Sequence, residues 1–334
     1  MRGKHVIKLR DNRVAYELTI QRNITIIRGD SATGKTTLLE MMDECLRYGD
    51  ESGIHMECDV PVDVYMSDDR RTDWKKRLIE SEGSIIFIEE MNSFVKTKEF
   101  ADFVSGSKSY FVLVTRWNLK SLPYSVEEIY RLSEKGKYPG TKQIYNSLER
   151  YYPSGDVADI IYMDKVITED SGSGYEFYKI LCENAALQCE SAVGNSNILK
   201  YMRDNEECNV LYIADGAAFG AFMDDCMYLM KYNRKGKNIL WLPESFEYLI
   251  LKAGIVKISN IADILENTSE YVNSEQFVSW ERFYTNLLIE NTSNSEQKYS
   301  KRNLEDYYKS DNIIHKIEKV MPVFIQKIFR GNGE

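Results

Sequence analysis

A glycine-rich stretch near the N-terminus carries the most specific chemistry in the chain. Gly29 is followed by four residues and then by Gly34–Thr36 (Gly-Lys-Thr), the spacing of a phosphate-binding loop. Such a loop turns its N–H groups toward phosphate oxygens, while a lysine holds the β- and γ-phosphates and a threonine hydroxyl binds magnesium. We therefore expect Lys35 to be catalytic and Thr36 to be a metal ligand. The predicted nucleotide-binding residues are Gly29, Asp30, Ser31, Ala32, Thr33, Gly34, Lys35, Thr36 and Thr37.

The residues on either side of this loop fit the elements that must position it. Residues 24–27 (Ile-Thr-Ile-Ile) predict a strand that runs into Gly29. Apolar residues at helical spacing between 38 and 42 predict a helix that begins near Lys35, with its positive end toward the phosphate. The alternative is a chance glycine-rich turn before a helix, and the flanking strand and helix argue against it.

Two acids follow a second informative stretch. Ile85–Ile88 is a short apolar run, typical of a strand buried in a parallel sheet. Glu89 and Glu90 come directly after it, at the strand end where α/β sheets bind ligands. We expect Glu89 to hold magnesium and Glu90 to accept a proton from an attacking water. The alternative is an exposed acidic turn.

A third buried strand is predicted at 110–115, and it ends at Arg116. A polar side chain at this position can sense the γ-phosphate of a bound nucleotide, which makes Arg116 a candidate catalytic residue. Arg116 can equally pair with an acidic neighbour, and both interpretations stay open.

A second set of acids lies in the later half of the chain. A predicted strand at 165–168 ends at Glu169, and another at 209–214 ends at Asp215. Because parallel strands end at one edge of a sheet, we expect both carboxylates to be catalytic metal ligands. Two-metal sites of this kind hydrolyse phosphodiesters. Acids that merely begin a turn are the alternative.

Composition restricts the class of protein. The chain has 334 residues, a net charge of −9 and a pI near 5.2, which excludes a surface that is basic all over and built for nucleic acid. Six scattered cysteines without a C-x-x-C pair predict reduced thiols in a cytoplasmic protein. The N-terminus lacks a signal peptide, and no apolar run is long enough to span a membrane.

The coarse pattern predicts an α/β fold with two sheet-forming domains. A hairpin over 5–10 and 14–20 precedes the first strand, and a strand over 127–132 is expected to close the first sheet. Gly, Lys, Tyr and Ser then mark a boundary, α/β alternation resumes, and the end of the chain has a helical pattern. The expected organisation is an ATPase domain at 1–135, a linker at 136–160, a second α/β domain at 161–260 and a helical region at 261–334.

The order of features in the first part resembles the ATP-binding cassette ATPases, over about residues 1–135. The hairpin, the loop Gly29–Thr36, the paired acids and the strand ending at Arg116 carry the resemblance, which is closest to DNA-repair and phage-defence ATPases. The chain departs from the family because residues 37–84 leave no room for the helical subdomain, and both the L-S-G-G-Q signature and the Q-loop glutamine are missing. These departures put the usual ATP-sandwich dimer in doubt. No N-K-x-D motif is present, so ATP is expected rather than GTP.

The second part resembles a Toprim domain, over about residues 160–260. Val166–Glu169 before a glycine turn is similar to the first Toprim motif, and Leu211–Gly220 is similar to the motif that carries an aspartate pair. Residues 192–198 resemble the small loop that often follows the first Toprim motif. Residues 242–247 resemble the acidic segment that follows the next strand of a Toprim domain. The second aspartate of the pair is Ala217 here, and a methyl group binds no metal. The acids that could replace it are Asp224, Asp225, Glu244 and Glu247.

A cassette ATPase followed by a Toprim domain is the arrangement of the OLD (overcoming lysogenisation defect) nucleases. The resemblance implies an ATPase that controls a magnesium-dependent nuclease in phage defence or DNA maintenance, with ATP and DNA or RNA as ligands, as a homo-oligomer or in complex with a partner protein. An ATPase switch with an inactive Toprim-like domain and a P-loop kinase are the alternatives. Lys301 is either a residue that stabilises transition-state charge or a solvated helix start.

Overall fold

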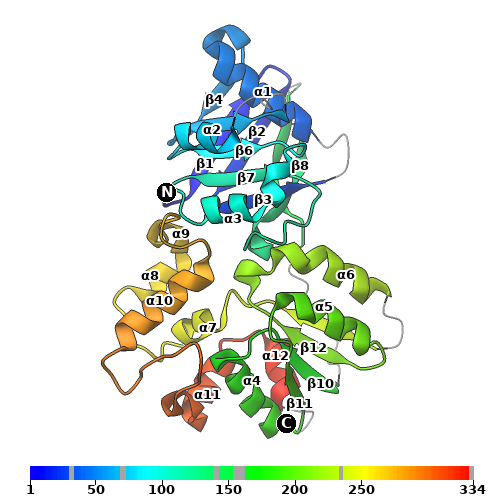
Figure 1. The fold of residues 1–334 in the computed structure, drawn as a ribbon, viewed down its shortest axis with the longest axis vertical. Coiled ribbons are helices and arrows are strands. Elements are labelled where there is room, and N and C mark those ends of the chain that lie inside the picture. Colours follow the sequence, from blue (N-terminus) through cyan, green and yellow to red (C-terminus); the bar gives the residue numbers. More distant parts are fainter. Residues whose placement is uncertain (30–33, 68–72, 138–142, 153–161, 233–235, 331–334) are drawn as a thin grey trace. The chain divides into compact units, whose positions relative to one another are not determined.

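The computed structural model describes residues 1–29, 34–67, 73–137, 143–152, 162–232 and 236–330 (Figure 1). Asp30, Ser31, Ala32 and Thr33, four of the predicted nucleotide-binding residues, lie outside these ranges. The chain forms two compact units. The first comprises Met1–Pro153 and Asn267–Ser279, and the second comprises Ser154–Glu266 and Trp280–Glu334.

The described part of the first unit contains a nine-stranded mixed sheet in the order β4-β1-β2-β9-β8-β3-β7-β6-β5. Strands β8, β3, β7, β6 and β5 run parallel to one another, whereas β1 pairs antiparallel with β2 as the predicted hairpin. The strands are β1 His5–Arg10, β2 Val14–Ile20, β3 Ile24–Arg28, β4 His55–Glu57, β5 Val62–Tyr65, β6 Ile85–Ile88, β7 Tyr110–Val114, β8 Ile129–Lys137 and β9 Ile144–Arg150.

The central strands β3, β6 and β7 have every residue buried, as their apolar sequences predict. Helix α1 (Lys35–Tyr48) follows β3 and buries the apolar face at Leu38, Leu39 and Met42 in the core. The other helices of this unit are α2 Trp74–Glu80, α3 Lys98–Val104 and α9 Thr268–Tyr271. The prediction of a strand, a loop and a helix around the glycine stretch is therefore confirmed at both flanks.

Two boundary predictions for the first unit are wrong. Residues 127–132 do not close the sheet, because β8 lies inside it between β9 and β3. Within the expected linker at 136–160, Ile144–Arg150 forms β9, which pairs antiparallel with β8 and parallel with β2. The polar residues of β9 interrupt its apolar pattern, and its side chains are only partly buried, so the sequence did not indicate a strand here.

A segment near the C-terminus also belongs to the first unit. Residues 267–279 join it through backbone hydrogen bonds from Gly3 N–H to the Ser269 carbonyl (2.8 Å) and from Ser274 N–H to the Met1 carbonyl (2.9 Å). The buried Asn23 amide donates to the carbonyls of Ser274 (3.1 Å) and Phe277 (3.0 Å). The expected helical region at 261–334 is thus divided between the two units.

The described part of the second unit has a four-stranded parallel sheet in the order β11-β10-β12-β13. Its strands are β10 Lys165–Thr168, β11 Gln188–Ser191, β12 Val210–Ile213 and β13 Asn238–Trp241. Its helices are α4 Ser173–Asn184, α5 Asn195–Asp204, α6 Met223–Tyr232, α7 Phe246–Lys252, α8 Ile261–Glu266, α10 Trp280–Thr292, α11 Asp311–Glu318 and α12 Val323–Arg330.

Register places the ends of the central strands of this sheet together. Thr168 of β10 lies opposite Ile213 of β12, and Ile213 lies opposite Trp241 of β13. The residues that follow these strands therefore share one edge, which is the edge that binds ligands in parallel sheets. An α/β fold with a mixed sheet and helices is confirmed. Among the described residues, no helix has the length and apolar character needed to cross a membrane.

Candidate functional site

The two ends of the glycine loop are joined by the lysine that follows it. Lys35 Nζ donates a hydrogen bond to the Gly29 carbonyl (2.7 Å), and the Lys35 side chain is buried. Gly29 (φ 145°) and Gly34 (φ 86°) both lie in the left-handed region that favours glycine. Gly34 also accepts a hydrogen bond from the Tyr16 hydroxyl (3.2 Å), which ties the start of α1 to β2. The loop ends thus depend on glycine and lysine at the predicted positions.

The first turn of α1 is open to an anion. Thr36 and Thr37 are exposed, and the turn contains no acidic residue. A helix start without a nearby carboxylate keeps its positive dipole end available. The side-chain hydroxyl of Thr36 therefore lies where a ligand of the loop can reach it.

The paired acids after β6 have different partners. Glu89 Oε2 accepts the Ser67 amide hydrogen (2.7 Å). Glu90 Oε1 accepts the Arg116 amide hydrogen (3.2 Å) and lies 3.7 Å from Arg116 Nε. Of the two roles considered for Arg116, pairing with an acidic neighbour is the one seen here. Because this arginine side chain is half exposed, the ion pair is weak and can be rearranged.

One strand separates the glycine loop from the paired acids. The order β3-β7-β6 places Gly29, Arg116 and Glu90 after three neighbouring parallel strands. Strands in a sheet lie about 4.8 Å apart, so the loop and the acids are separated by about 10 Å. The glycine loop and the paired acids therefore lie at the same edge of the sheet.

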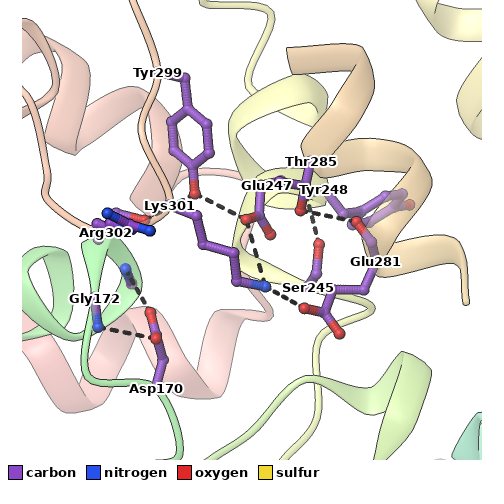
Figure 2. Close-up of polar contacts among 12 residues, drawn as sticks. Asp170, Gly172, Ser245, Glu247, Tyr248, Glu281, Thr285, Tyr299, Lys301 and Arg302 are labelled. Carbon is purple, nitrogen blue, oxygen red and sulfur yellow. Dashed lines mark hydrogen bonds and ion pairs between the residues drawn. The ribbon is translucent and has the colours of Figure 1, made fainter. Parts of the chain in front are cut away.

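In the second unit, the acid next to Glu169 is used as a helix cap. Asp170 accepts the Gly172 amide hydrogen at Oδ1 and the Gly174 amide hydrogen at Oδ2, both at 2.9 Å (Figure 2). These contacts provide acceptors for N–H groups at the start of α4 that have none within the helix, and the negative charge of Asp170 stabilises the positive end of the helix. Glu169 is therefore the acid of this pair that remains for other chemistry.

Glu169 and Asp215 are brought into one electrostatic environment. Burial raises the pKa of Glu169 to about 7, and the charges of Glu281 and Asp170 add to the rise while Lys301 opposes it. Burial also raises the pKa of Asp215 well above its usual range, followed by the charges of Glu281 and Glu247. The charge of Glu281 therefore disfavours ionisation of both Glu169 and Asp215, as expected for acids that share one site.

Glu247 has one buried oxygen without a partner. It lies in the first turn of α7, and 1 % of its surface is exposed. Its Oε1 atom accepts a hydrogen bond from the Tyr299 hydroxyl (2.9 Å), which also contacts Ser173 Oγ (2.8 Å). The Oε2 atom is buried and has no hydrogen-bond partner. An unsatisfied buried carboxylate oxygen is costly unless a cation or a donor reaches it.

Lys301 and Glu281 complete the group, and motif-based reasoning overlooked Glu281. Lys301 Nζ forms an ion pair with Glu281 and lies 4.0 Å from Glu247 Oε1 (Figure 2). Glu281 lies in the first turn of α10, far from the strands in sequence, and no local signal points to it. Lys301 does not begin a helix, so the expected alternative role as a solvated helix start is wrong. We call Glu169, Asp215, Glu247, Glu281 and Lys301 the carboxylate cluster.

Backbone hydrogen bonds fix the position of Ala217, the residue found where the Toprim motif has its second aspartate. Gly216 N–H donates to the Pro243 carbonyl (2.7 Å) and Ala217 N–H donates to the Glu244 carbonyl (3.2 Å), which leaves the Ala217 side chain buried. Of the acids considered as replacements for an aspartate here, Glu247 is the one whose charge acts strongly on Asp215.

The carboxylate cluster fits a divalent cation in charge and donor type. Four carboxylates face one ammonium, and one carboxylate oxygen is buried without a partner. Hard oxygen donors of this kind suit Mg²⁺ or Mn²⁺. Among the described residues, no group of three or more His, Cys, Asp or Glu side chains is already arranged around a metal position. Lys301 lies between Glu247 and Glu281 and contacts both.

Comparison of the chain with protein-family models, with curated proteins and with solved structures gives no match.

Proposed function

We propose that the first unit is a P-loop ATPase. The observation that carries the proposal is the hydrogen bond from Lys35 Nζ to the Gly29 carbonyl, at the start of α1 and one strand away from Glu89 and Glu90. The N–H groups at the start of α1 bind the phosphates of ATP, and Lys35 exchanges the Gly29 carbonyl for the β- and γ-phosphates. The cassette-type fold is part of this proposal.

Other residues of the first unit bind the metal and activate the water in this proposal. Thr36 and Glu89 hold the Mg²⁺ that accompanies ATP, which neutralises phosphate charge. Glu90 accepts a proton from the attacking water, and Arg116, its present partner, is placed to turn toward the γ-phosphate. A pair of acids beside the loop favours transfer to water over transfer to a kinase substrate.

ATP binding and hydrolysis test this proposal directly. Lys35→Ala is expected to abolish ATP binding, whereas Glu90→Gln is expected to bind ATP and hydrolyse it at least a hundredfold more slowly. Lys98→Ala and Glu80→Gln change exposed side chains of the same unit and serve as matched controls. Undiminished hydrolysis in both test variants would rule the assignment out.

A second candidate function is favoured by the carboxylate cluster. We propose that the second unit, as a Toprim-like domain, cleaves phosphodiester bonds of DNA or RNA under the control of the ATPase, as in OLD-like proteins of phage defence or DNA maintenance. Glu169, Asp215 and Glu247 would hold a divalent cation, which supplies Lewis-acid and nucleophile-generating chemistry when bound. Lys301 remains a cationic side chain at the same edge, available to the phosphate.

A cleavage assay separates a nuclease from an ATPase switch that binds nucleic acid without cutting. Plasmid, linear duplex and single-stranded DNA and RNA are incubated with Mg²⁺ or Mn²⁺, with and without ATP. Cleavage that disappears in Glu169→Ala and Asp215→Ala supports the nuclease. Intact substrates under every condition would leave the switch as the better description.

A further inference from the structure

The carboxylate cluster has only one acid, Asp215, in the segment that follows β12. Ala217 occupies the second position after Asp215, and its side chain is buried while its backbone is tied to the Glu244 carbonyl. The segment 215–218 therefore contributes only the Asp215 carboxylate to the edge of the sheet. A cation held there needs a ligand from another element, because hard cations require several oxygen donors.

Helix α10 delivers such a carboxylate. It packs against the turn Gly216–Ala218 and against α7, the helix that carries Glu247. Glu281 lies in the first turn of α10 and points toward the Lys301 ammonium from the side opposite Glu247 (Figure 2). The Glu281 side chain is 18 % exposed, so it lies largely within the site.

The lysine between these acids is fixed at its backbone by a contact that does not involve its side chain. Its carbonyl accepts the Ser173 amide hydrogen (3.0 Å), whereas its side chain is 42 % exposed. A flexible side chain with access to water can withdraw while the backbone stays in place. Withdrawal opens the space between Glu247 Oε1 and Glu281 to an incoming cation, and Glu247 Oε2 already has no hydrogen-bond partner.

We propose that Glu281 is a cation ligand in place of the acid missing at Ala217, and that the Lys301 ammonium occupies the position between Glu247 and Glu281 until a divalent cation displaces it. The inference rests on the cation-dependent function proposed for the second unit. It assigns a ligand outside the strand-end motifs, and it makes Lys301 a competitor of the metal.

Direct measurement of Mn²⁺ binding tests the inference without relying on activity. Free Mn²⁺ is titrated by electron paramagnetic resonance with the full-length chain at pH 7.5, without nucleotide. The signal of the second unit is the binding lost in Asp215→Asn. We expect Glu281→Gln to weaken this binding at least tenfold and Lys301→Met to strengthen it at least tenfold. Glu290→Gln, an exposed acid on the same helix, is expected to bind as the wild type does.

A compensating substitution sharpens the result. Ala217→Asp in the Glu281→Gln background is expected to recover part of the lost affinity, because it restores an acid at the turn. Equal affinity of Glu281→Gln and Glu290→Gln would overturn the role of Glu281 and leave the nuclease proposal standing. Weaker binding in Lys301→Met would overturn the displacement. If no binding depends on Asp215 in either the wild type or Lys301→Met, the cation-dependent function itself fails.

Discussion

The Lys301 carbonyl oxygen lies so close to Gly172 that a β-carbon on Gly172 would be 2.2 Å from it. The same carbonyl accepts the Ser173 amide hydrogen at 3.0 Å. The loop that carries Lys301 therefore packs directly against the turn that follows Glu169. This close packing is possible only because residue 172 has no side chain.

Gly172→Ala should displace the Lys301 loop and destabilise the chain. A contact of that length forces the backbone apart, and overpacking of this kind costs about 1–3 kcal/mol. Urea denaturation of both proteins measures the difference. Gly106→Ala is the control, because a β-carbon there meets no atom within 4 Å. If both alanine variants were equally stable, the close approach would have no energetic consequence.

Stability without divalent cations should fall as the pH rises from about 4.5 through about 7. The pKa of Glu169 is raised by burial, and next by the charge of Glu281, to about 7 from an ordinary value of 4.5. The folded state then binds a proton more tightly than the unfolded state, so the stabilisation is complete below pH 4.5 and is lost as the pH rises through 7.

Glu169→Gln removes this penalty and should stabilise the protein at pH 8 in EDTA, by up to about 3 kcal/mol. At pH 4.5 the variant and the wild type should be similar. Chemical denaturation at both pH values checks this, with the exposed Glu183→Gln on α4 as the control. A Glu169→Gln protein no more stable than the wild type at pH 8 would contradict the expected shift.

Tyr299→Phe should destabilise the carboxylate cluster. The buried Tyr299 hydroxyl joins Ser173 Oγ to Glu247 Oε1, and Glu247 already has one oxygen without a partner. Removing the hydroxyl takes away the donor to Glu247 Oε1, so that neither oxygen of this carboxylate then accepts a hydrogen bond from the residues that the structure describes. The cost is about 1–3 kcal/mol. Thermal or urea denaturation measures the loss, and Tyr48→Phe at an exposed position should change nothing. Equal stability of the two variants would show that the hydroxyl contributes little.

The pair of Asp63 and Arg77 should stabilise the first unit above pH 4. Arg77 contacts both oxygens of Asp63, at 2.7 and 2.6 Å. Burial raises the pKa of Asp63, but the hydrogen bonds from Arg77 and Ser81 outweigh burial, so the pKa falls below its ordinary value of 3.8. The stabilisation is therefore present above pH 3.8 and disappears as the pH falls through the lower, folded-state value.

Asp63→Asn is expected to lose about 1–3 kcal/mol at pH 7 and progressively less below pH 4. A double-mutant cycle with Arg77→Gln isolates the pair. The exposed pair of Lys75 and Glu99 is the control, since Glu99→Gln should leave stability unchanged at both pH values. A loss in Asp63→Asn that did not depend on pH would point to packing instead of charge.

Local signals predicted the elements that flank the glycine loop. Strands β3, β6 and β7 are short apolar runs, and α1 repeats its apolar residues at helical spacing, so neither depends on distant partners for its assignment. The same signals placed Glu89, Glu90, Glu169 and Asp215 after strands. These residues were accessible to sequence reasoning because the ends of parallel strands share an edge.

Contacts between residues far apart in the sequence could not be predicted from local signals. Strand β9 is largely polar, and it becomes a strand by pairing with β8 and β2. Glu281 joins Asp215 and Glu169 only because α10 packs near the turn after β12. No periodicity in the sequence reports such a contact, so both features required the three-dimensional structure.

The return of residues 267–279 to the first unit has a consequence for how the chain can be divided. The polypeptide passes between the units three times, near residues 153, 266 and 279, so no single cut separates them. A fragment that ends at residue 153 would lack the Ser274 and Phe277 carbonyls and leave the buried Asn23 amide without these acceptors. Either activity is therefore best studied in the full-length chain, with point substitutions in place of truncations.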